Sequence, residues 1–200
     1  MPRQRQLRQV SLRGDYVRLE PLRLSHAEAL WPAASEPGLF QHLAPGTEAS
    51  LENLRAWIMR RLEEEDLDFS QPFVQVDPAT QKPFGVTCFL NISVRHKRVE
   101  IGHTWMGASH RRTPANTEAK LLMLRHAFDD WEAIRVQFKC DVDNQRAIDA
   151  LERIGAVREG RMRNERIMIE GTIRDSYVYS IIREEWREVE KRLERFLLVR

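Results

Sequence analysis

The sequence predicts an α+β fold in a single domain, with one mixed β-sheet that carries helices on both faces. The chain has 200 residues, which suits one domain with a sizeable core. Alternating and apolar runs typical of strands fill its middle, and segments with helical periodicity are interleaved with the later strands. With 42% hydrophobic and 31% charged residues, the composition is that of a globular protein. We therefore expect the order β-α-α-β-β-β-α-β-α-β-β-α.

The first residues differ in composition from the rest of the chain. Residues 1–13 contain four arginines and no acidic residue, which predicts a flexible basic arm before a domain that spans residues 14–200. The first strand is expected over residues 16–22, where Val and Leu alternate with charged residues.

Two helices are expected after this strand. Ser25 is placed to cap a short helix from His26 to about Trp31, and the Pro/Gly-rich stretch 32–46 predicts a loop. Ser50 is placed to cap the second helix. The apolar residues of that helix recur at helical spacing and should face the core: Leu51, Leu54, Trp57, Ile58 and Leu62.

Three strands follow, separated by segments with turn chemistry. The expected strands cover residues 73–76, 84–94 and 99–106. Residues 78–83, which begin and end with Pro, and the basic residues 95–97 predict the two connecting turns.

A short basic turn joins the last of these strands to the central helix. Arg111 and Arg112 precede Thr113 and Pro114, a pair that favours an N-cap followed by the first helical residue. Unpaired N–H groups and a partial positive charge at a helix start attract anions, and two arginines strengthen such a site. We expect it to hold a diphosphate. The apolar face of the helix is formed by Leu121, Leu124, Phe128 and Trp131.

The last third of the chain alternates strands and helices. The expected elements are a strand at 135–142, a helix that Asn144 opens and Gly155 ends, and two hairpin strands at 157–169 and 173–182 about the turn Glu170-Gly171-Thr172.

A final helix is expected at residues 184–198, within the same domain. Its apolar stripe should dock on the domain itself, and the alternative is a contact with a second subunit in a homodimer. The stripe consists of Trp186, Val189, Leu193, Phe196 and Leu197.

Charge and cysteine content narrow the class of protein. The net charge of +2 is nearly balanced, so binding to nucleic acid is not indicated. Cys88 and Cys140 lie in strand-like runs and predict buried free thiols, which fits a reducing cytoplasm. No segment approaches the about 18 apolar residues of a membrane span, and no apolar leader follows Met1. We therefore expect a cytoplasmic protein that does not contact a membrane.

The histidines outside the strand at 99–106 do not predict a metal site. They fall on separate expected elements without the spacing of known metal-binding motifs, so no metal is expected. These residues are His26, His42, His96, His110 and His126.

Three motifs, taken in order, resemble one family. TEAKLLMLRHAF (117–128) is similar to the TEA-x-x-x-L-x-x-x-AF stretch of the RimJ/RimL-like branch, which acetylates the N-termini of ribosomal proteins. DVDNQRAIDALERIGAVREG (141–160) is similar to the N-x-x-S-x-x-x-x-x-x-x-G segment of that branch, and RDSYVYSIIREEW (174–186) to its final strand and closing EW. Over roughly residues 17–186 the chain thus resembles the GNAT superfamily of acyl-CoA-dependent N-acetyltransferases.

The resemblance implies that acetyl-CoA is the co-substrate and that its diphosphate binds at residues 111–116. The family pattern there is Q/R-x-x-G-x-G/A; Arg111 fits it, but Pro114 replaces the first Gly and removes one N–H donor, and Asn116 replaces the small residue. The hydroxyl of Thr113 or the amide of Asn116 can substitute as a donor. The expected cofactor contacts are Trp105, Met106, Arg111, Arg112, Thr113, Ala115, Asn116, Thr117 and Asn144.

The resemblance also implies how the thioester is held. The strands at 99–106 and 135–142 should separate, so that pantetheine pairs with the exposed edge of the first of them. Backbone N–H groups near Trp105 and Met106 would then polarise the thioester carbonyl. Positioning of this kind lowers the activation barrier by several kcal/mol, so the site needs no covalent nucleophile. Neither cysteine lies at the expected reaction centre. We expect direct attack by the amine.

Two residues of the strand at 99–106 are candidates for the general base. Glu100 and His103 are three residues apart and would face opposite sides of a regular strand, unless a bulge at Gly102 realigns them. A histidine has a suitable pKa for accepting the proton, directly or through water. Both candidates stay open at this point.

A general acid is harder to assign from the sequence. Ala147 stands where many relatives have Ser, and the helix that Asn144 opens contains no Tyr. Solvent can protonate the departing thiolate, which leaves a dedicated acid in question. Asn144 should cap its helix, alone or while also contacting pantetheine.

The sequence therefore favours an N-acetyltransferase that acetylates a primary amine, either a protein N-terminus or a small-molecule amine. The loop at 32–46 and the second helix should shape the choice of amine. The alternative is a coenzyme-A-binding or interaction module without turnover, which the departures at Pro114 and Ala147 motivate. A third hypothesis, nucleic-acid binding, depends on the basic arm alone.

Overall fold

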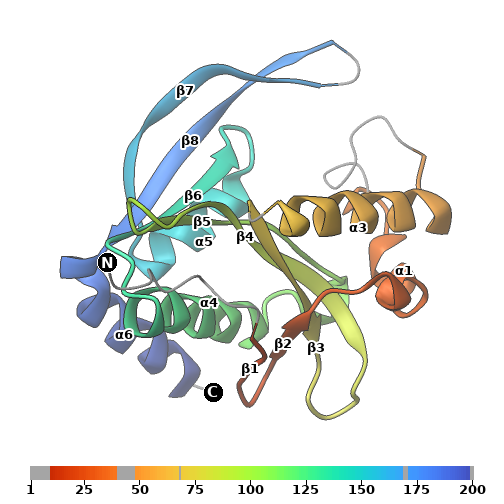
Figure 1. Ribbon diagram of the computed structural model, residues 1–200, viewed down its shortest axis with the longest axis horizontal. Helices are drawn as coiled ribbons and strands as arrows, with labels where there is room; N and C mark the ends of the chain where they lie inside the picture. The colour runs from red at the N-terminus through yellow and green to blue at the C-terminus, as the bar shows by residue number, and fades with distance from the viewer. Residues whose placement is uncertain (1–9, 40–47, 68, 169–170, 199–200) are drawn as a thin grey trace.

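The computed structural model describes residues 10–39, 48–67, 69–168 and 171–198. Within these residues one eight-stranded sheet has the order β1-β2-β3-β4-β5-β6-β8-β7 (Figure 1). β5 and β6 are parallel and the other neighbours are antiparallel, so the sheet is mixed. The strands are β1 (Leu12–Arg13), β2 (Arg18–Pro21), β3 (Ser70–Val76), β4 (Pro83–Ser93), β5 (Arg98–Met106), β6 (Arg135–Asp141), β7 (Val157–Ile167) and β8 (Ile173–Ile182).

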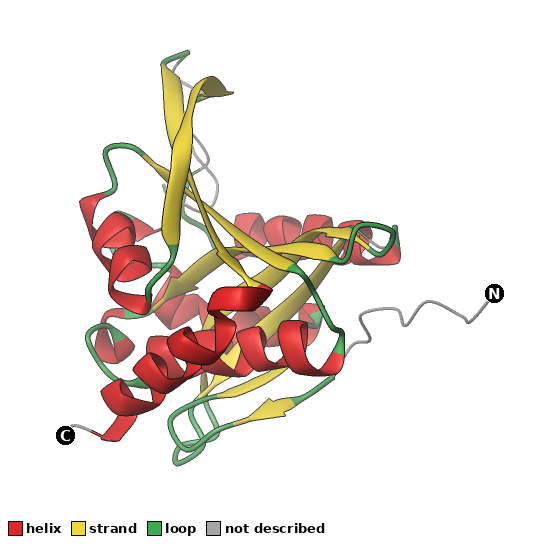
Figure 2. Ribbon diagram, turned by 90° about the vertical axis from the view of Figure 1, so that its left-hand side faces the viewer, coloured by secondary structure: helices red, strands yellow, loops and turns green. Residues whose placement is uncertain are grey.

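Helices lie on both faces of this sheet (Figures 1 and 2), which confirms the α+β class. The β7–β8 hairpin extends away from the body of the molecule in both views. The α-helices are α1 (Ala27–Ala34), α3 (Leu51–Asp66), α4 (Ala115–Arg125), α5 (Gln145–Ile154) and α6 (Arg183–Leu198), with short 3-10 turns η1 (Leu24–His26) and η2 (Ala108–His110) and a π-helical turn η3 (His126–Asp130).

Two hydrophobic cores lie on opposite faces of the sheet. The larger core contains buried residues of α4, α5 and α6, and the smaller core contains buried residues of α1 and α3. Residues of β5 enter both: Val99 and Ile101 lie in the larger core, while Trp105 lies in the smaller one. Because the strand alternates in this way, its polar side chains are directed to defined faces of the sheet.

The last helix docks on its own domain, as the sequence predicts. Trp186, Val189 and Leu193 of α6 are buried in the larger core, and the Trp186 ring stacks on Phe128 with a centroid distance of 5.3 Å. The indole N–H of Trp186 also donates to Asp129 at 3.0 Å. This part of the stripe is therefore covered within one chain.

Several predicted helix ends are confirmed. The Ser50 hydroxyl accepts from the N–H of Asn53 at the start of α3, and the side-chain oxygen of Asn144 accepts from the N–H of Ala147 at the start of α5. Gly155 ends α5 with φ of 94°, a left-handed conformation that costs glycine little.

The first helix differs from its prediction. Ser25 lies in η1 and makes no capping bond, and α1 runs from Ala27 to Ala34, through the beginning of the expected loop. Pro32 lies inside α1 because Ala27, Leu30 and Ala34 are buried in the smaller core. Their burial outweighs the hydrogen bond that Pro32 cannot donate. Residues 40–47 of the expected loop lie outside the described residues.

The end of the expected arm also differs. Leu12 and Arg13, which the sequence places in the arm, form β1 against Leu19 and Arg18 of β2. Leu12 packs against the larger core, which accounts for its order. Residues 1–9 lie outside the described residues.

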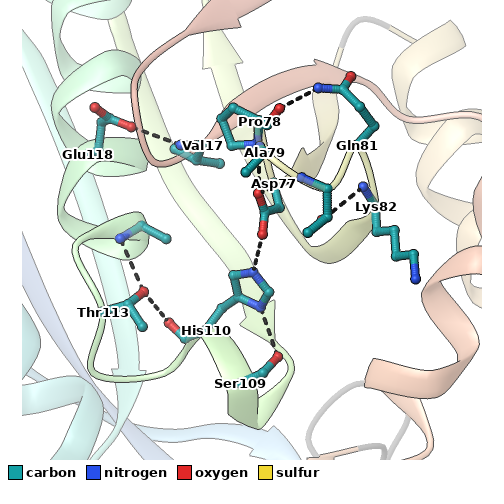
Figure 3. Close-up of polar contacts among 12 residues, drawn as sticks. Val17, Asp77, Pro78, Ala79, Gln81, Lys82, Ser109, His110, Thr113 and Glu118 are labelled. Atoms are coloured by element: carbon teal, nitrogen blue, oxygen red, sulfur yellow. Dashed lines mark hydrogen bonds and ion pairs between the residues drawn. The ribbon is translucent and has the colours of Figure 1, made fainter.

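A buried carboxylate fastens the segment between β1 and β2 to α4. The Glu118 carboxylate accepts from the N–H groups of Asp15, Tyr16 and Val17, at 2.9, 2.6 and 2.8 Å (Figure 3 shows the contact with Val17). Gly14 is needed beside it, because a Cβ there would lie 2.3 Å from the carboxylate. The acid of the TEA motif therefore stabilises the fold.

We expect Glu118→Gln to destabilise the protein by about 3 kcal/mol, because three N–H groups would lose a charged acceptor and at least one of them would face the amide N–H₂ group instead of an oxygen. Urea unfolding followed by circular dichroism measures the change. The matched control is Glu188→Gln on the exposed side of α6, which should leave the midpoint unchanged. Equal effects of the two substitutions would show that Glu118 does not fasten this segment.

Candidate functional site

The site is built where two neighbouring strands separate. β5 and β6 pair only from Arg98 to Glu100 and from Arg135 to Gln137; beyond this, β5 continues beside β4 and β6 beside β8. The edge of β5 from Ile101 to Met106 is therefore open on the side of β6, as the family resemblance implies. An open strand edge offers N–H and C=O groups to an extended ligand.

A β-bulge interrupts β5 on this open edge. Val86 lies opposite Trp105 and Cys88 lies opposite Gly102, so His103 and Thr104 together oppose Thr87. His103 has φ of 48°, which is uncommon for a residue other than glycine. The bulge thus lies one residue after the expected position, Gly102, and it has the expected effect of reversing the alternation of side chains.

Because of this bulge, Glu100 and His103 face the same side of the sheet. His103 contacts α3, where its ring is edge-on to Trp57 with a centroid distance of 6.2 Å. Glu100 contacts Gln137, whose neighbours in β6 point into the larger core on the opposite face. The next residue of the bulge, Thr104, faces α4 instead, where it contacts Lys120.

Glu100 is buried with one carboxylate oxygen engaged and the other available. Oε2 accepts from the side-chain amides of Asn91 at 2.9 Å and Gln137 at 3.1 Å, and the Lys139 ammonium lies 3.8 Å away. No hydrogen bond from the described residues reaches Oε1, which lies beside Gly102. The carboxylate is therefore fixed in place and keeps an acceptor for a water molecule or an amine.

His103 is held by a guanidinium group. Nη1 of Arg61 lies 2.7 Å from Nε2 of His103, and because arginine only donates, Nε2 must carry the lone pair of a neutral ring. The side chain keeps some solvent contact, but the surrounding protein and the charges of Arg61, Arg166 and Lys139 lower the pKa of His103 to about 4. With its lone pair engaged, His103 is a poor proton acceptor in this arrangement.

The end of β5 presents one backbone N–H to the open edge. The carbonyl of Trp105 accepts from the side-chain amide of Gln75 at 3.1 Å and lies over Gly85, where a Cβ would come within 2.3 Å of it. Because the peptide bond is trans, the N–H of Met106 points the opposite way, toward the open edge. Of the two residues expected to polarise a carbonyl, Met106 has the suitable orientation.

The turn after β5 is braced by His110. Its ring stacks on Phe84 with a centroid distance of 3.9 Å and an interplanar angle of 4°. Nε2 lies 3.2 Å from the Asp77 carboxylate, and Nδ1 lies 2.9 Å from the Ser109 hydroxyl (Figure 3). These contacts fix the path of the chain into α4.

The start of α4 lies one residue later than expected. Pro114 is the N-cap and Ala115 the first helical residue, but the Thr113 hydroxyl still accepts from the N–H of Ala115 at 3.3 Å and donates to the carbonyl of His110 at 2.8 Å (Figure 3). The N–H groups of Asn116 and Thr117 belong to the first turn and have no partner within the helix. They are the backbone donors available for an anion.

Arg111 is engaged by the protein itself. Nη2 of Arg111 donates to the Glu36 carboxylate at 2.9 Å and Nε donates to the carbonyl of Met106 at 3.1 Å. Glu36 also accepts from the N–H of Ala108 at 2.7 Å. Nη1 of Arg111 forms no hydrogen bond with the described residues, so it can still donate to an anion, although the negative charge of Glu36 opposes an anion there.

Two other arginines lie at the helix start. Arg112 is exposed, has φ of 60° and forms no ion pair with the described residues. Arg153 of α5 donates to the Thr117 hydroxyl at 2.8 Å and lies over the Phe196 ring at 4.7 Å. Sequence reasoning missed Arg153 because no local pattern places a residue of α5 at the start of α4. The helix start is nevertheless positively charged without Arg111.

Of the two asparagines among the cofactor candidates, one has a structural role and the other has an unsatisfied polar atom. Asn144 caps α5 through its side-chain oxygen, 3.1 Å from the N–H of Ala147. Asn116 has its side-chain oxygen buried without a hydrogen-bond partner among the described residues. A buried polar atom of this kind can be satisfied by a ligand or a water molecule.

A sequence model described as an acetyltransferase (GNAT) domain matches residues 17–157, well over half of the chain. The chain belongs to the GNAT acetyltransferase family. The resemblance drawn from the three motifs is thereby confirmed at the level of the family.

Relatives of this GNAT acetyltransferase support the same placement. The putative ribosomal N-acetyltransferase YdaF of Bacillus subtilis is 28% identical over 102 residues, which cover 51% of this chain and 55% of that protein. The matched region thus spans about half the length of this curated relative.

Two solved structures match over nearly their full length. A putative acetyltransferase from T. thermophilus is 36% identical to this chain, with a TM-score of 0.84. The match covers 94% of this chain and 96% of that structure's chain. A second structure, described as a putative acetyltransferase, is 37% identical with the same TM-score of 0.84 and covers 92% of both chains.

Two further findings concern the described part of this GNAT domain. No three His, Cys, Asp or Glu residues there are grouped so that they could hold a metal ion. None of the helices described is long and apolar enough to cross a membrane.

We expect His103 to make the stability of the domain depend on pH. The pKa of His103 lies below its ordinary value of 6.5 in the folded protein, so between pH 6.5 and about 4 only the unfolded chain takes up this proton. The stabilisation is present above pH 6.5 and is lost as the pH falls through this window. Thermal unfolding at a series of pH values should show a shallower acid loss in His103→Gln.

The control for this measurement is His96→Gln in the exposed turn after β4, which should keep the wild-type pH dependence. Identical pH dependence of the wild-type chain and His103→Gln would contradict the described environment of His103.

Proposed function

We propose that this GNAT acetyltransferase transfers the acetyl group of acetyl-CoA to a primary amine by direct attack of the amine on the thioester. The observation that carries the proposal is the open edge of β5 beside the start of α4, created where β5 and β6 separate after Glu100. An extended pantetheine arm pairs with a strand edge, and a diphosphate is suited to a helix start. Cys88 and Cys140 are buried thiols, so neither is available as the nucleophile of a covalent intermediate, and direct attack by the amine does not need one.

The diphosphate is proposed to lie against Arg112 and the N–H groups of Asn116 and Thr117. These donors belong to one turn of chain, so they converge on a single anion. Thr113 and Ala115 shape this turn through their mutual hydrogen bond. Their contribution is therefore mainly to position the donors.

Further along the cofactor, the pantetheine arm would follow β5 toward the bulge. The N–H of Met106 faces this path, and Trp105 supports it from the smaller core. Arg111 is proposed to join the anion site through Nη1, which Glu36 does not contact. Asn144, at the start of α5, is proposed to touch the arm through the amide nitrogen that its capping role leaves available.

The amine is proposed to approach from the face that carries Glu100 and His103. Oε1 of Glu100 takes the proton of the attacking amine, directly or through a water molecule. His103, tied to Arg61 and neutral, serves to shape this face. A protein N-terminus or a small-molecule amine fits, because an α-amino group with a pKa near 8 needs only a modest base.

Isothermal titration with acetyl-CoA, followed by a panel of amines read by release of free thiol, tests this function. Mass spectrometry of the product identifies the acetylated nitrogen. The expected result is binding with a micromolar dissociation constant, on the order of −8 kcal/mol, and thiol release with at least one amine. Absence of binding at a hundredfold excess would overturn the proposal.

A coenzyme-A-binding module without turnover is the second candidate. The Glu36–Arg111 pair and the missing N–H donor at Pro114 favour it, because both weaken the anion site. Binding of acetyl-CoA without thiol release across the whole amine panel would select this alternative.

The proposed compartment is the cytoplasm. Cys88 and Cys140 are free and buried, and burial raises the pKa of the Cys88 thiol to about 12. Such thiols are typical of proteins in a reducing environment.

We expect Glu100→Gln to lower kcat by about a hundredfold, the usual contribution of a general base. The amide keeps an oxygen for Asn91 and Gln137, so KM for acetyl-CoA should change little. Steady-state kinetics at saturating amine provide the measurement. The matched comparison is His103→Gln, with a smaller expected loss; a larger loss in His103→Gln would make His103 the base.

We expect Arg112→Gln to raise KM for acetyl-CoA about tenfold and to lower kcat less, since one charge-assisted hydrogen bond to a diphosphate contributes about 1.5–3 kcal/mol. Arg111→Gln should show a smaller rise in KM, because Glu36 already engages that side chain. Initial rates with varied acetyl-CoA measure both effects. If kcat falls while KM stays constant, the arginine concerned lies outside the diphosphate site.

A further inference from the structure

Lys120 of α4 is a buried amine in a position where the fold does not need one. Its side chain is almost fully covered, and no carboxylate of the described residues forms an ion pair with it. Its one described polar contact is the donation from Nζ to the Thr104 hydroxyl at 2.9 Å. A methionine of similar volume would fill the same space without the cost of desolvating an ammonium group.

The residue that Lys120 contacts belongs to the open stretch of β5. Thr104 is the second residue of the bulge and is exposed, and its side chain is on the α4 face of the sheet. Its hydroxyl also shares a hydrogen bond of 2.8 Å with Thr87, which in turn lies 3.5 Å from the sulfur of Met123. The Thr104 proton can therefore turn from Thr87 to an acceptor at the edge while Lys120 holds the oxygen.

The reaction needs a proton at this place. When the carbon–sulfur bond of the thioester breaks, the electron pair stays on sulfur, and the thiolate must be protonated or stabilised. Ala147 at the start of α5 has no hydroxyl, and α5 contains no tyrosine. The start of α5 therefore offers no side-chain hydroxyl as a proton donor.

We propose, on the basis of the function proposed above, that Thr104 protonates the departing thiolate of coenzyme A. Lys120 holds the Thr104 hydroxyl in position and returns a proton to its oxygen. The Thr104 O–H bond breaks as the new S–H bond forms, and an N–H proton of the Lys120 ammonium passes to the Thr104 oxygen. Lys120 is left as a neutral amine and regains a proton from solvent between turnovers. Glu100 separately takes the proton that the amine loses, so the charges balance.

The bulge places these two proton transfers on opposite faces of β5. Glu100 and His103 face α3, while Thr104 faces α4, although His103 and Thr104 are adjacent in sequence. A thioester lying along the strand edge between them would meet the amine from one face and the proton donor from the other. This separation keeps the base from neutralising the acid.

The ionisation of Lys120 suits this role. Burial lowers the pKa of Lys120 to about 7, and Cys88 of β4 acts in the opposite direction. Cys88 remains protonated, since burial raises its own pKa to about 12. No other charged group of the described elements packed on Lys120 acts on its pKa. An ammonium group with a pKa near 7 is a stronger acid than a thiol, whose usual pKa is about 8.5. Proton transfer from Lys120 through Thr104 to the thiolate sulfur is therefore favourable.

Thr104→Val, Thr104→Ser and Lys120→Met test the proposal in the full-length chain. The acceptor is the fastest amine of the panel, and kcat is measured by thiol release from pH 5.5 to 9.5 at saturating substrates. Thr104→Val and Lys120→Met should lower kcat by about a hundredfold, whereas Thr104→Ser should keep most of it. The wild-type kcat should decline on the alkaline side as Lys120 loses its proton, and this decline should be absent in Lys120→Met.

Two further measurements separate this role from a structural one. Titration with acetyl-CoA should give wild-type affinity for Thr104→Val. The melting temperature of Lys120→Met should be higher than that of the wild-type chain, because the desolvated amine is removed. A less active but more stable Lys120→Met cannot owe its loss of activity to unfolding.

The outcomes distinguish this inference from the proposed function. If the wild-type chain turns over an amine while Thr104→Val keeps its kcat, or Lys120→Met keeps the alkaline decline, the proton-donor role is wrong and the acetyltransferase function stands. If the wild-type chain neither binds nor cleaves acetyl-CoA, both proposals are overturned together.

Discussion

The extra residue in β5 opposite Thr87 is the constraint on which the geometry of the site depends. It reverses the alternation of side chains, so Glu100 and His103 share a face while Thr104 faces the other way. It also lies just beyond the point where β6 leaves β5. A strand with regular alternation would have placed the two base candidates on opposite faces, and a fully paired strand would have left no edge for a ligand.

The surrounding structure supports this irregular strand. The Gln75 amide and the missing side chain of Gly85 hold the carbonyl of Trp105 away from the open edge. Arg61 and Trp57 of α3 hold His103, whose φ of 48° would otherwise be costly. The contacts of Glu118 with the segment before β2 keep α4 in place beside the strand. Each of these contacts joins residues that are far apart in the sequence.

Several polar side chains are buried here at the expense of stability. Glu100 is covered by β4 and β6 and Lys120 lies under β5, while the partly exposed His103 is kept neutral by the surrounding protein and by nearby cations. An apolar residue at either of the two buried positions, Glu100 and Lys120, would suit the fold better, because buried ionisable groups lose hydration. Their gathering around the open edge of one strand is what an active site requires, and it is unusual for a purely structural region.

The sequence by itself determined the order of the elements and the family, because helical periodicity, strand alternation and capping residues such as Ser50 and Asn144 act within a few residues. It also offered Glu100 and His103 as base candidates, and it placed the helix start at Thr113-Pro114 within one residue of the observed start. Only the tertiary structure decided that Glu36 engages Arg111, that Arg61 takes the lone pair of His103, and that Arg153 joins the start of α4. Those contacts connect residues 36 to 75 positions apart, and the electrostatic field that sets their roles exists only when the chain is folded.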